Sequence, residues 1–199
     1  MESDNPFERT SSATRPNTYF VGQLLLSMPA MPDPRFKKSV IAMCRHDANG
    51  ALGINLGELV EGIDLHRLMN QVGIDPRDAP NVPVHKGGPV DNGRGFIVHS
   101  LDYKTADVLN VGDKWGLSGS LELLRAIANG KGPKHWLVAL GYSGWSAGQL
   151  ESEMAMQGWL LANCEHDTLF EIEAADRWEK SYANEQIDPR LISADFGTA

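Results

Sequence analysis

The residues with the clearest chemical potential lie in segment 137–153, where an apolar run leads into glycines, serines and aromatic residues. Residues 144–148 match G-x-S-x-G, the pattern that places a nucleophilic serine on a sharp strand-to-helix turn. Two features weaken that interpretation for Ser146. The predicted strand ends several residues earlier, at Leu140, and His166 is the only histidine downstream. A serine hydrolase is therefore kept as the alternative function.

Polar side chains at the start of the following predicted helix suggest other roles. Ser146 and Gln149 form an S-x-x-Q capping box, which predicts that Ser146 is the helix N-cap. Glu151 and Glu153 are two positions apart and point to nearly opposite helix faces, so they cannot act as a facing acid and base. Both fall in the first helical turn, where the helix dipole favours negative charge. Gln149 and Glu153, four apart, could share a polar face that lines a cleft.

A second glycine-rich segment, residues 87–89, follows a short predicted strand at 82–85. Its backbone N–H groups could face an anion, but Pro89 removes one donor and no Lys-Ser/Thr pair follows, so it is no phosphate loop. A structural turn and a ligand-facing loop both stay open. Arg94 suits a ligand carboxylate or a nearby aspartate equally well. His99 ends an apolar strand, where it faces a cleft or is held by structural hydrogen bonds.

Aromatic and histidine residues give weaker signals. Tyr142 and Trp145, flanked by glycines, form either a recognition platform or part of the core. The histidines show no H-x-H, H-x-x-x-H or H-E-x-x-H spacing, so we predict neither a metal site nor a cofactor. They are His46, His66, His85, His99, His135 and His166.

The composition and charge of the chain limit the classes of function that it can have. The 199 residues carry 18 basic and 26 acidic side chains, a formal charge of −8 that disfavours direct nucleic-acid binding. No apolar stretch approaches the roughly 20 residues needed to cross a bilayer, so no membrane contact is expected. Residues 1–17 are polar and are predicted to be a disordered tail, without a signal peptide. Cys44 and Cys164 lie outside any cluster; Cys44 is predicted to be a buried free thiol, and we expect a reducing cytoplasm.

Periodicity and cap signals predict an α+β protein, because helices and strands alternate irregularly. Strands are expected at residues 19–27, 39–45, 51–56, 82–85, 95–100, 135–140 and 169–172. Asn49-Gly50 predicts a hairpin between the second and third of these. Helices are expected at 65–72 after Asp64, at 121–128 after Ser118 or Ser120, at 149–161 and at 174–184, with a final turn opened by Asp188-Pro189.

Several phrases taken together resemble the YqgE/AlgH family of bacterial proteins, in order from residue 19 to the C-terminus. They are Gly22, Met28-Pro29-x-Met31-x-Asp33-Pro34-x-Phe36, Ser39-Val40, His46, Gly50-Ala51-x-Gly53-Ile54-Asn55, Gly87-Gly88-Pro89-Val90, Arg94-x-Phe96-x-Val98-His99, Gly130-x-Gly132-Pro133, the run Gly141 to Glu153, Trp159-Leu160 and Trp178. The resemblance implies a branched mixed or antiparallel sheet that includes a small closed barrel, flanked by helices. It implies no particular reaction; some members carry a transcriptional-regulator label. After Asn55 the family continues with a basic residue and proline, whereas this chain has Leu56-Gly57.

These observations favour one domain, residues 18–199, that binds a small molecule or a protein without transforming it. The glycine-rich segments are expected to meet around one pocket. Its candidate residues are Asn55, Gly87, Gly88, Arg94, His99, Tyr142, Gly144, Trp145, Gln149 and Glu153. The alternatives are a hydrolase that uses Ser146 or a His/Glu pair, and a transcriptional regulator on the family label alone.

Overall fold

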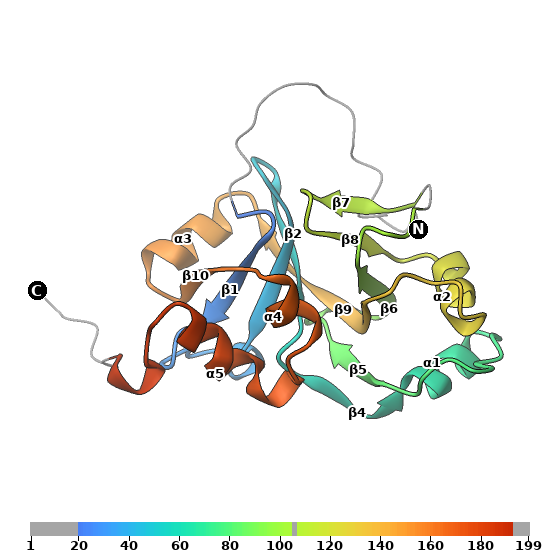
Figure 1. Cartoon of the computed structure of the whole chain (residues 1–199). Helices are drawn as coiled ribbons and strands as arrows, with labels where there is room; N and C mark the ends of the chain where they lie inside the picture. The colour runs from blue at the N-terminus through green and yellow to red at the C-terminus, as the bar shows by residue number, and fades with distance from the viewer. Residues whose placement is uncertain (1–19, 105–106, 193–199) are drawn as a thin grey trace, which may run out of the picture.

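The computed structural model describes residues 20–104 and 107–192, and the predicted tail at 1–17 lies outside them (Figure 1). The strands are β1 (Gln23–Ser27), β2 (Val40–Asp47), β3 (Gly50–Asn55), β4 (Leu59–Asp64), β5 (Pro83–Lys86), β6 (Val90–His99), β7 (Leu109–Val111), β8 (Trp115–Ser118), β9 (Trp136–Ser146) and β10 (Trp159–Asn163). The helices are α1 (Leu65–Gln71), α2 (Leu121–Ala128), α3 (Gln149–Ala155), α4 (His166–Phe170) and α5 (Ala174–Asn184), with short 3₁₀ turns η1 (Pro34–Phe36) and η2 (Pro189–Leu191). Among the described residues no helix is long and apolar enough to span a bilayer.

The strands form one curled sheet in the order β10-β1-β2-β3-β9-β6-β8-β7. The long strand β9 is its centre: its last residues pair with β3, and its first residues pair with β6 on one side and with β5, in parallel, on the other. β4 extends this side branch through β5. The α+β class is therefore confirmed. The closed barrel is wrong, because β10 and β7 end the described path as separate edges and the sheet stays open.

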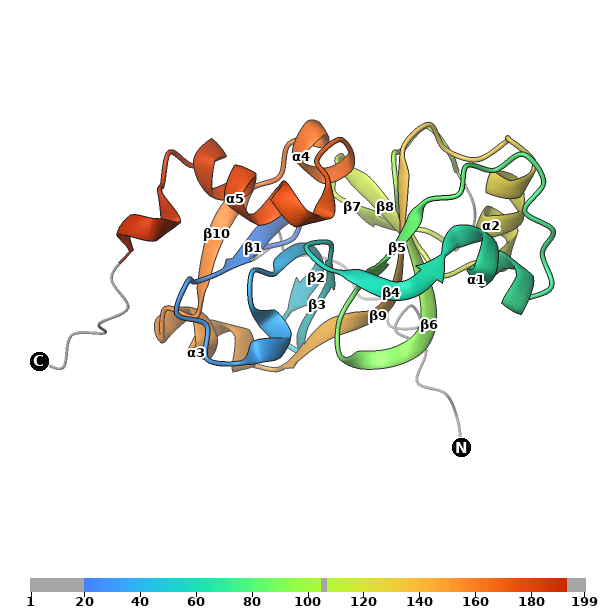
Figure 2. The ribbon, with the colours of Figure 1, turned by 90° about the horizontal axis from the view of Figure 1, so that it is seen from below.

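Helices cover both faces of the sheet. Leu24 and Leu26 of β1 point to the face where Trp178 of α5 packs, whereas Leu25 points to the opposite face with Leu150 of α3. This follows from the two-residue period of a strand. Figure 2 shows α5 and α3 on opposite sides of β1 and β10. At the other end of the molecule, α1 and α2 pack their apolar faces on the sheet around β5, β6 and β9.

Local signals position several elements correctly. Asp64 accepts a hydrogen bond from the Arg67 N–H at 2.8 Å, and Ser120 caps α2 by accepting from the Glu122 N–H at 3.0 Å. The hairpin predicted at Asn49-Gly50 joins β2 and β3. The predicted helix at 174–184 and the turn after Asp188 are also confirmed.

Three predicted elements depart most from the structure. The strand at 135–140 continues to Ser146, because the glycine-rich segment pairs with β3. The helix predicted to reach Leu161 ends at Ala155: Gln157 takes a left-handed φ of 56° and the Gly158 N–H donates to the Glu153 carbonyl, after which β10 pairs with β1. The predicted strand at 169–172 instead overlaps α4, which buries Leu169 in the core.

Candidate functional site

The Glu153 carboxylate is the centre of a hydrogen-bond cluster at the start of α3. Its Oε2 accepts from the indole N–H of Trp145 at 2.9 Å and from that of Trp159 at 2.8 Å. Its Oε1 accepts from the Gln149 side-chain amide at 3.0 Å. The Gln149 carbonyl oxygen in turn accepts from the backbone N–H and the hydroxyl of Ser146, both at 3.1 Å. Three neutral donors thus fix the orientation of one carboxylate.

The strands bring the two tryptophans together from distant parts of the sequence. Trp145 lies on β9 opposite Ala51, and Trp159 starts β10 opposite Ser27. Both indoles are nearly buried, and their ring centroids lie 6.0 Å apart in an edge-to-face arrangement. Phe36 packs edge-on to Trp159 at 5.5 Å. The carboxylate of Glu153 therefore borders an aromatic cluster whose packing limits its movement.

A cavity of about 320 Å³ opens beside this cluster. The Pro-rich loop that follows β1 forms one wall, and the end of α3 with the start of β10 forms the other. Its lining residues are Met28, Ala30, Met31, Pro32, Asp33, Phe36, Glu153, Met156, Gln157, Gly158 and Trp159. Two carboxylates and no Lys, Arg or His occur among these described residues. We call this cavity the Glu153 pocket.

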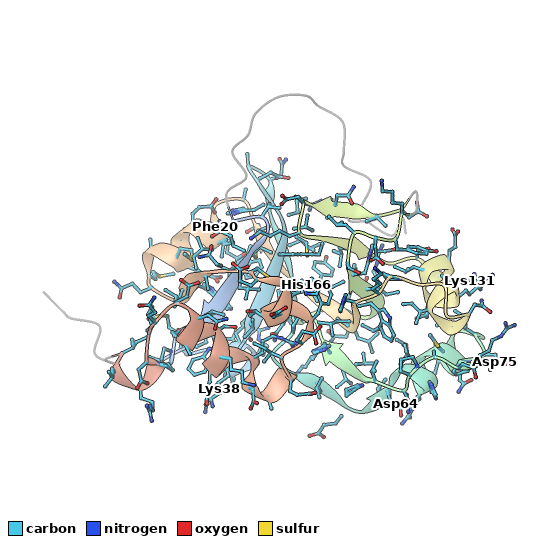
Figure 3. The ribbon with its side chains drawn as sticks, viewed as in Figure 1. Phe20, Lys38, Asp64, Asp75, Lys131 and His166 are labelled. Carbon is cyan, nitrogen blue, oxygen red and sulfur yellow. The ribbon has the colours of Figure 1, made fainter. Side chains whose placement is uncertain are left out.

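Ser146 is not the helix N-cap that the sequence predicts. The N-cap is Gly148, at φ 73° and without a side-chain cap bond, because β9 runs up to Ser146. Half of the expected capping box is present, since the Gln149 side chain reaches back to the Ser146 N–H. The Ser146 hydroxyl is exposed and bonds to an amide oxygen rather than to a histidine. His166, labelled in Figure 3, instead contacts the ring of His135 at 4.5 Å between centroids.

A His/Glu pair does occur, at the other side of α3. The Nε2 of His46 lies 3.1 Å from Oε1 of Glu151, with the imidazole buried and the carboxylate 43% exposed. The His46 ring packs on Phe20 at 4.9 Å. Glu151 and Glu153 thus serve separate surroundings, as their spacing predicts.

The two glycine-rich segments meet, but through backbone contact. The Gly87 N–H donates to the Leu140 carbonyl at 2.8 Å. A Cβ atom on Gly88, whose φ is 155°, would lie 2.2 Å from the carbonyl carbon and oxygen of Tyr142. Only glycine permits such an approach. The backbone of β9 fills the space in front of Gly87 and Gly88, where the sequence suggested a ligand.

Other candidate residues serve the framework. Asn55 is buried; its Oδ1 accepts from the Val40 and Gly57 N–H groups and its Nδ2 donates to the Ser39 hydroxyl at 3.1 Å. Gly144 is exposed on β9, opposite Leu52. These contacts hold the loop after β3 and the end of β9 in place.

Arg94 lies in the middle of β6, and His99 is its last residue. The Arg94 guanidinium carbon stands 5.4 Å from the Phe96 ring centroid, and Phe96 packs edge-on to Tyr142 at 5.8 Å. His99 is fully buried opposite Trp136, and its Nδ1 lies 2.9 Å from the Ser100 carbonyl oxygen. Burial lowers the pKa of His99. The structure therefore gathers Trp145, Gln149 and Glu153 in one site and leaves Arg94 and His99 outside it.

Local sequence patterns do not reveal Trp159, Phe36 or the methionines of the Pro-rich loop as site residues. The sequence predicts a helix at Trp159, whereas its approach to Trp145 depends on the pairing of β10 with β1. The phrase from Met28 to Phe36 was the available signal, because it places apolar side chains in a loop whose prolines fix its path.

A second cavity, of about 690 Å³, lies beside α5. Lys38, labelled in Figure 3, forms part of it; its ammonium lies 3.0 Å from Glu179 and 5.5 Å from the Trp178 ring centroid. Met28 lines both cavities. No cluster of three or more His, Cys, Asp or Glu side chains able to hold a metal occurs in the described parts of the chain.

Comparison with known proteins places this architecture in a family. The AlgH-like family model matches residues 24–190. UPF0301 proteins of Rhizorhabdus wittichii and Novosphingobium aromaticivorans are 51% and 49% identical; the alignments cover 89% and 91% of this chain and 96% and 97% of theirs.

Solved structures agree. The solution structure of AlgH from Pseudomonas aeruginosa has a TM-score of 0.75 and 31% identity, covering 95% of this chain and all of that one. A crystal structure of a Corynebacterium diphtheriae protein, 17% identical with a TM-score of 0.68, covers 92% of this chain and 94% of its own, and shares the fold. The chain therefore belongs to the YqgE/AlgH family.

Proposed function

We propose that this protein is a non-catalytic binding protein with a regulatory role, and that the Glu153 pocket is its ligand site. The observation that carries the proposal is a carboxylate held by two indole N–H groups and one amide at the wall of an otherwise largely apolar cavity. Small-molecule sites combine such apolar walls with a few fixed polar groups. The volume of about 320 Å³ lies at the small end of that class.

The proposed ligand site lies apart from the contact between the two glycine-rich segments. Gly87, Gly88 and Asn55 then act as the framework that fixes β9, and through it Trp145. Pre-positioning of this kind lowers the entropy lost when a ligand binds. The feature of α3 that forms the proposed site is the face shared by Gln149 and Glu153, as their four-residue spacing predicts.

The two alternatives have less support. A serine hydrolase needs a base within hydrogen-bond reach of Ser146, whose hydroxyl instead donates to Gln149. Direct DNA contact is disfavoured by the charge of −8. We further propose a cytoplasmic location and one domain over residues 18–199. The free thiols of Cys44 and Cys164, buried as predicted for Cys44, agree with a reducing compartment.

A titration with 1-hexanol as a neutral apolar probe tests the binding site. We expect the indole N–H NMR signals of Trp145 and Trp159 to shift saturably, and that of Trp178, beside the other cavity, to stay in place. Ala30→Phe, which fills the pocket, should abolish the shifts, whereas Ala155→Phe on the exposed side of α3 should not. Shifts of Trp178 alone, or no saturable shift, would refute the proposal.

A further inference from the structure

We infer that the ligand of the Glu153 pocket carries a primary ammonium group on an apolar stem; this inference rests on the proposed function. The charge of the pocket is the first reason. Both ionisable side chains that line it are acids, and Glu153 forms no ion pair with any described residue. Asp33, at the opposite wall, is paired with Arg35 at 2.6 Å, and hydrogen bonding to Arg35 lowers its pKa. Glu153 thus supplies a negative charge that no cation in the described parts of the chain neutralises.

The hydrogen bonds around Glu153 restrict the shape of the cation. A carboxylate offers about four acceptor positions. Two on Oε2 are taken by the indoles of Trp145 and Trp159, and one on Oε1 is taken by Gln149. One position therefore remains, on Oε1. A guanidinium binds a carboxylate best through two parallel bonds, one to each oxygen, whereas an ammonium needs only one acceptor.

The walls of the pocket suit the rest of such a ligand. Met31 and Met156 supply flexible, polarizable surface, and Trp159 and Phe36 supply aromatic surface. Aromatic rings attract ammonium ions as well as apolar chains. The volume of about 320 Å³ leaves room for a stem of roughly four to six carbons together with its ammonium group. We therefore assign the ligand class as small aliphatic primary amines.

The test compares probes of one shape and different charge by calorimetry and indole NMR. In the native protein, n-hexylammonium should bind at least about tenfold more tightly than 1-hexanol, and more tightly than n-butylguanidinium. Glu153→Gln should reduce hexylammonium affinity about tenfold and leave 1-hexanol almost unchanged. Glu151→Gln, which removes the same charge two residues away, is the matched control and should keep the preference.

The outcomes distinguish a failure of this inference from a failure of the proposed function. Equal affinity for 1-hexanol and hexylammonium would overturn the inference and leave the binding site standing. No saturable binding of either probe would overturn both. Tighter binding of butylguanidinium would refute the single-acceptor geometry, and tighter binding of Nα-acetyl-lysine methylamide would refute a free amine in favour of a lysine side chain. If Glu153→Gln fails to fold, Asp33→Asn gives the second test, with an expected loss of hexylammonium affinity of a few fold.

Discussion

His85 should make the stability of this protein depend on pH. The imidazole lies on β5 and is 5% exposed, and its Nδ1 has no hydrogen-bond partner in the described parts of the chain. Burial, reinforced by the positive charge of Arg177, lowers its pKa from 6.5 to about 3. In the unfolded chain His85 is protonated below about pH 6.5, whereas in the folded protein it stays neutral down to about pH 3. Stability is therefore unaffected above pH 6.5 and falls as the pH drops from 6.5 towards 3.

The size of the effect follows from the shift. At about pH 5, roughly 1.5 pH units below the ordinary pKa of histidine, His85 is protonated in the unfolded state but not in the folded state. Each pH unit below that pKa favours the unfolded state by ~1.4 kcal/mol. Wild type should thus lose about 2 kcal/mol of unfolding free energy through His85 between about pH 8 and pH 5. His85→Gln removes this titration.

Urea unfolding at both pH values measures the effect. The fall in unfolding free energy should be about 2 kcal/mol smaller in His85→Gln than in wild type. His166→Gln, with a side chain 47% exposed, is the control and should retain the wild-type fall. The same pH dependence in His85→Gln and wild type would refute the reasoning, because other groups would then account for it.

Three further substitutions test the framework. Arg177→Met should lower the unfolding free energy by about 3–5 kcal/mol, because the buried guanidinium donates to four backbone carbonyls, including that of Leu56. Chemical denaturation measures this loss, and a loss below about 1 kcal/mol would contradict the packing. Gly88→Ala should lower the unfolding free energy by at least about 2 kcal/mol, because the added Cβ would overlap the β9 backbone. Gly93→Ala, with open space around it, is the control and should be almost neutral. Equal melting temperatures of the two variants would refute the contact between Gly88 and β9. Ser120→Ala should cost about 1 kcal/mol through loss of the α2 cap, and an unchanged midpoint of urea unfolding would rule the cap out.

Signals confined to a few residues predicted the fold best. Asp64, Ser120 and Asp188 act as caps because a cap bond needs only the next two or three residues. The hairpin at Asn49-Gly50 depends on the turn alone. Segments whose structure depends on distant partners were predicted less well. β9 continues through its glycines because β3 pairs with them.

In the candidate site too, some residues follow from local patterns and others depend on the pairing of distant strands. The four-residue spacing of Gln149 and Glu153 correctly predicted a shared helix face, and Trp145 was selected for its place among glycines. The partner that completes the cluster, Trp159, depends on the pairing of β10 with β1, which no local pattern reveals. The buried Arg177 illustrates the same limit, because its acceptors include Leu56, more than a hundred residues away.

A crystal structure of the protein soaked with n-hexylammonium tests the central claim most directly. We expect the ammonium nitrogen at hydrogen-bond distance, about 2.8 Å, from Oε1 of Glu153, with the alkyl chain between Met31 and Trp159. An amine bound only in the cavity beside Trp178, or an alkyl chain in the Glu153 pocket with its ammonium turned away from the carboxylate, would contradict the account.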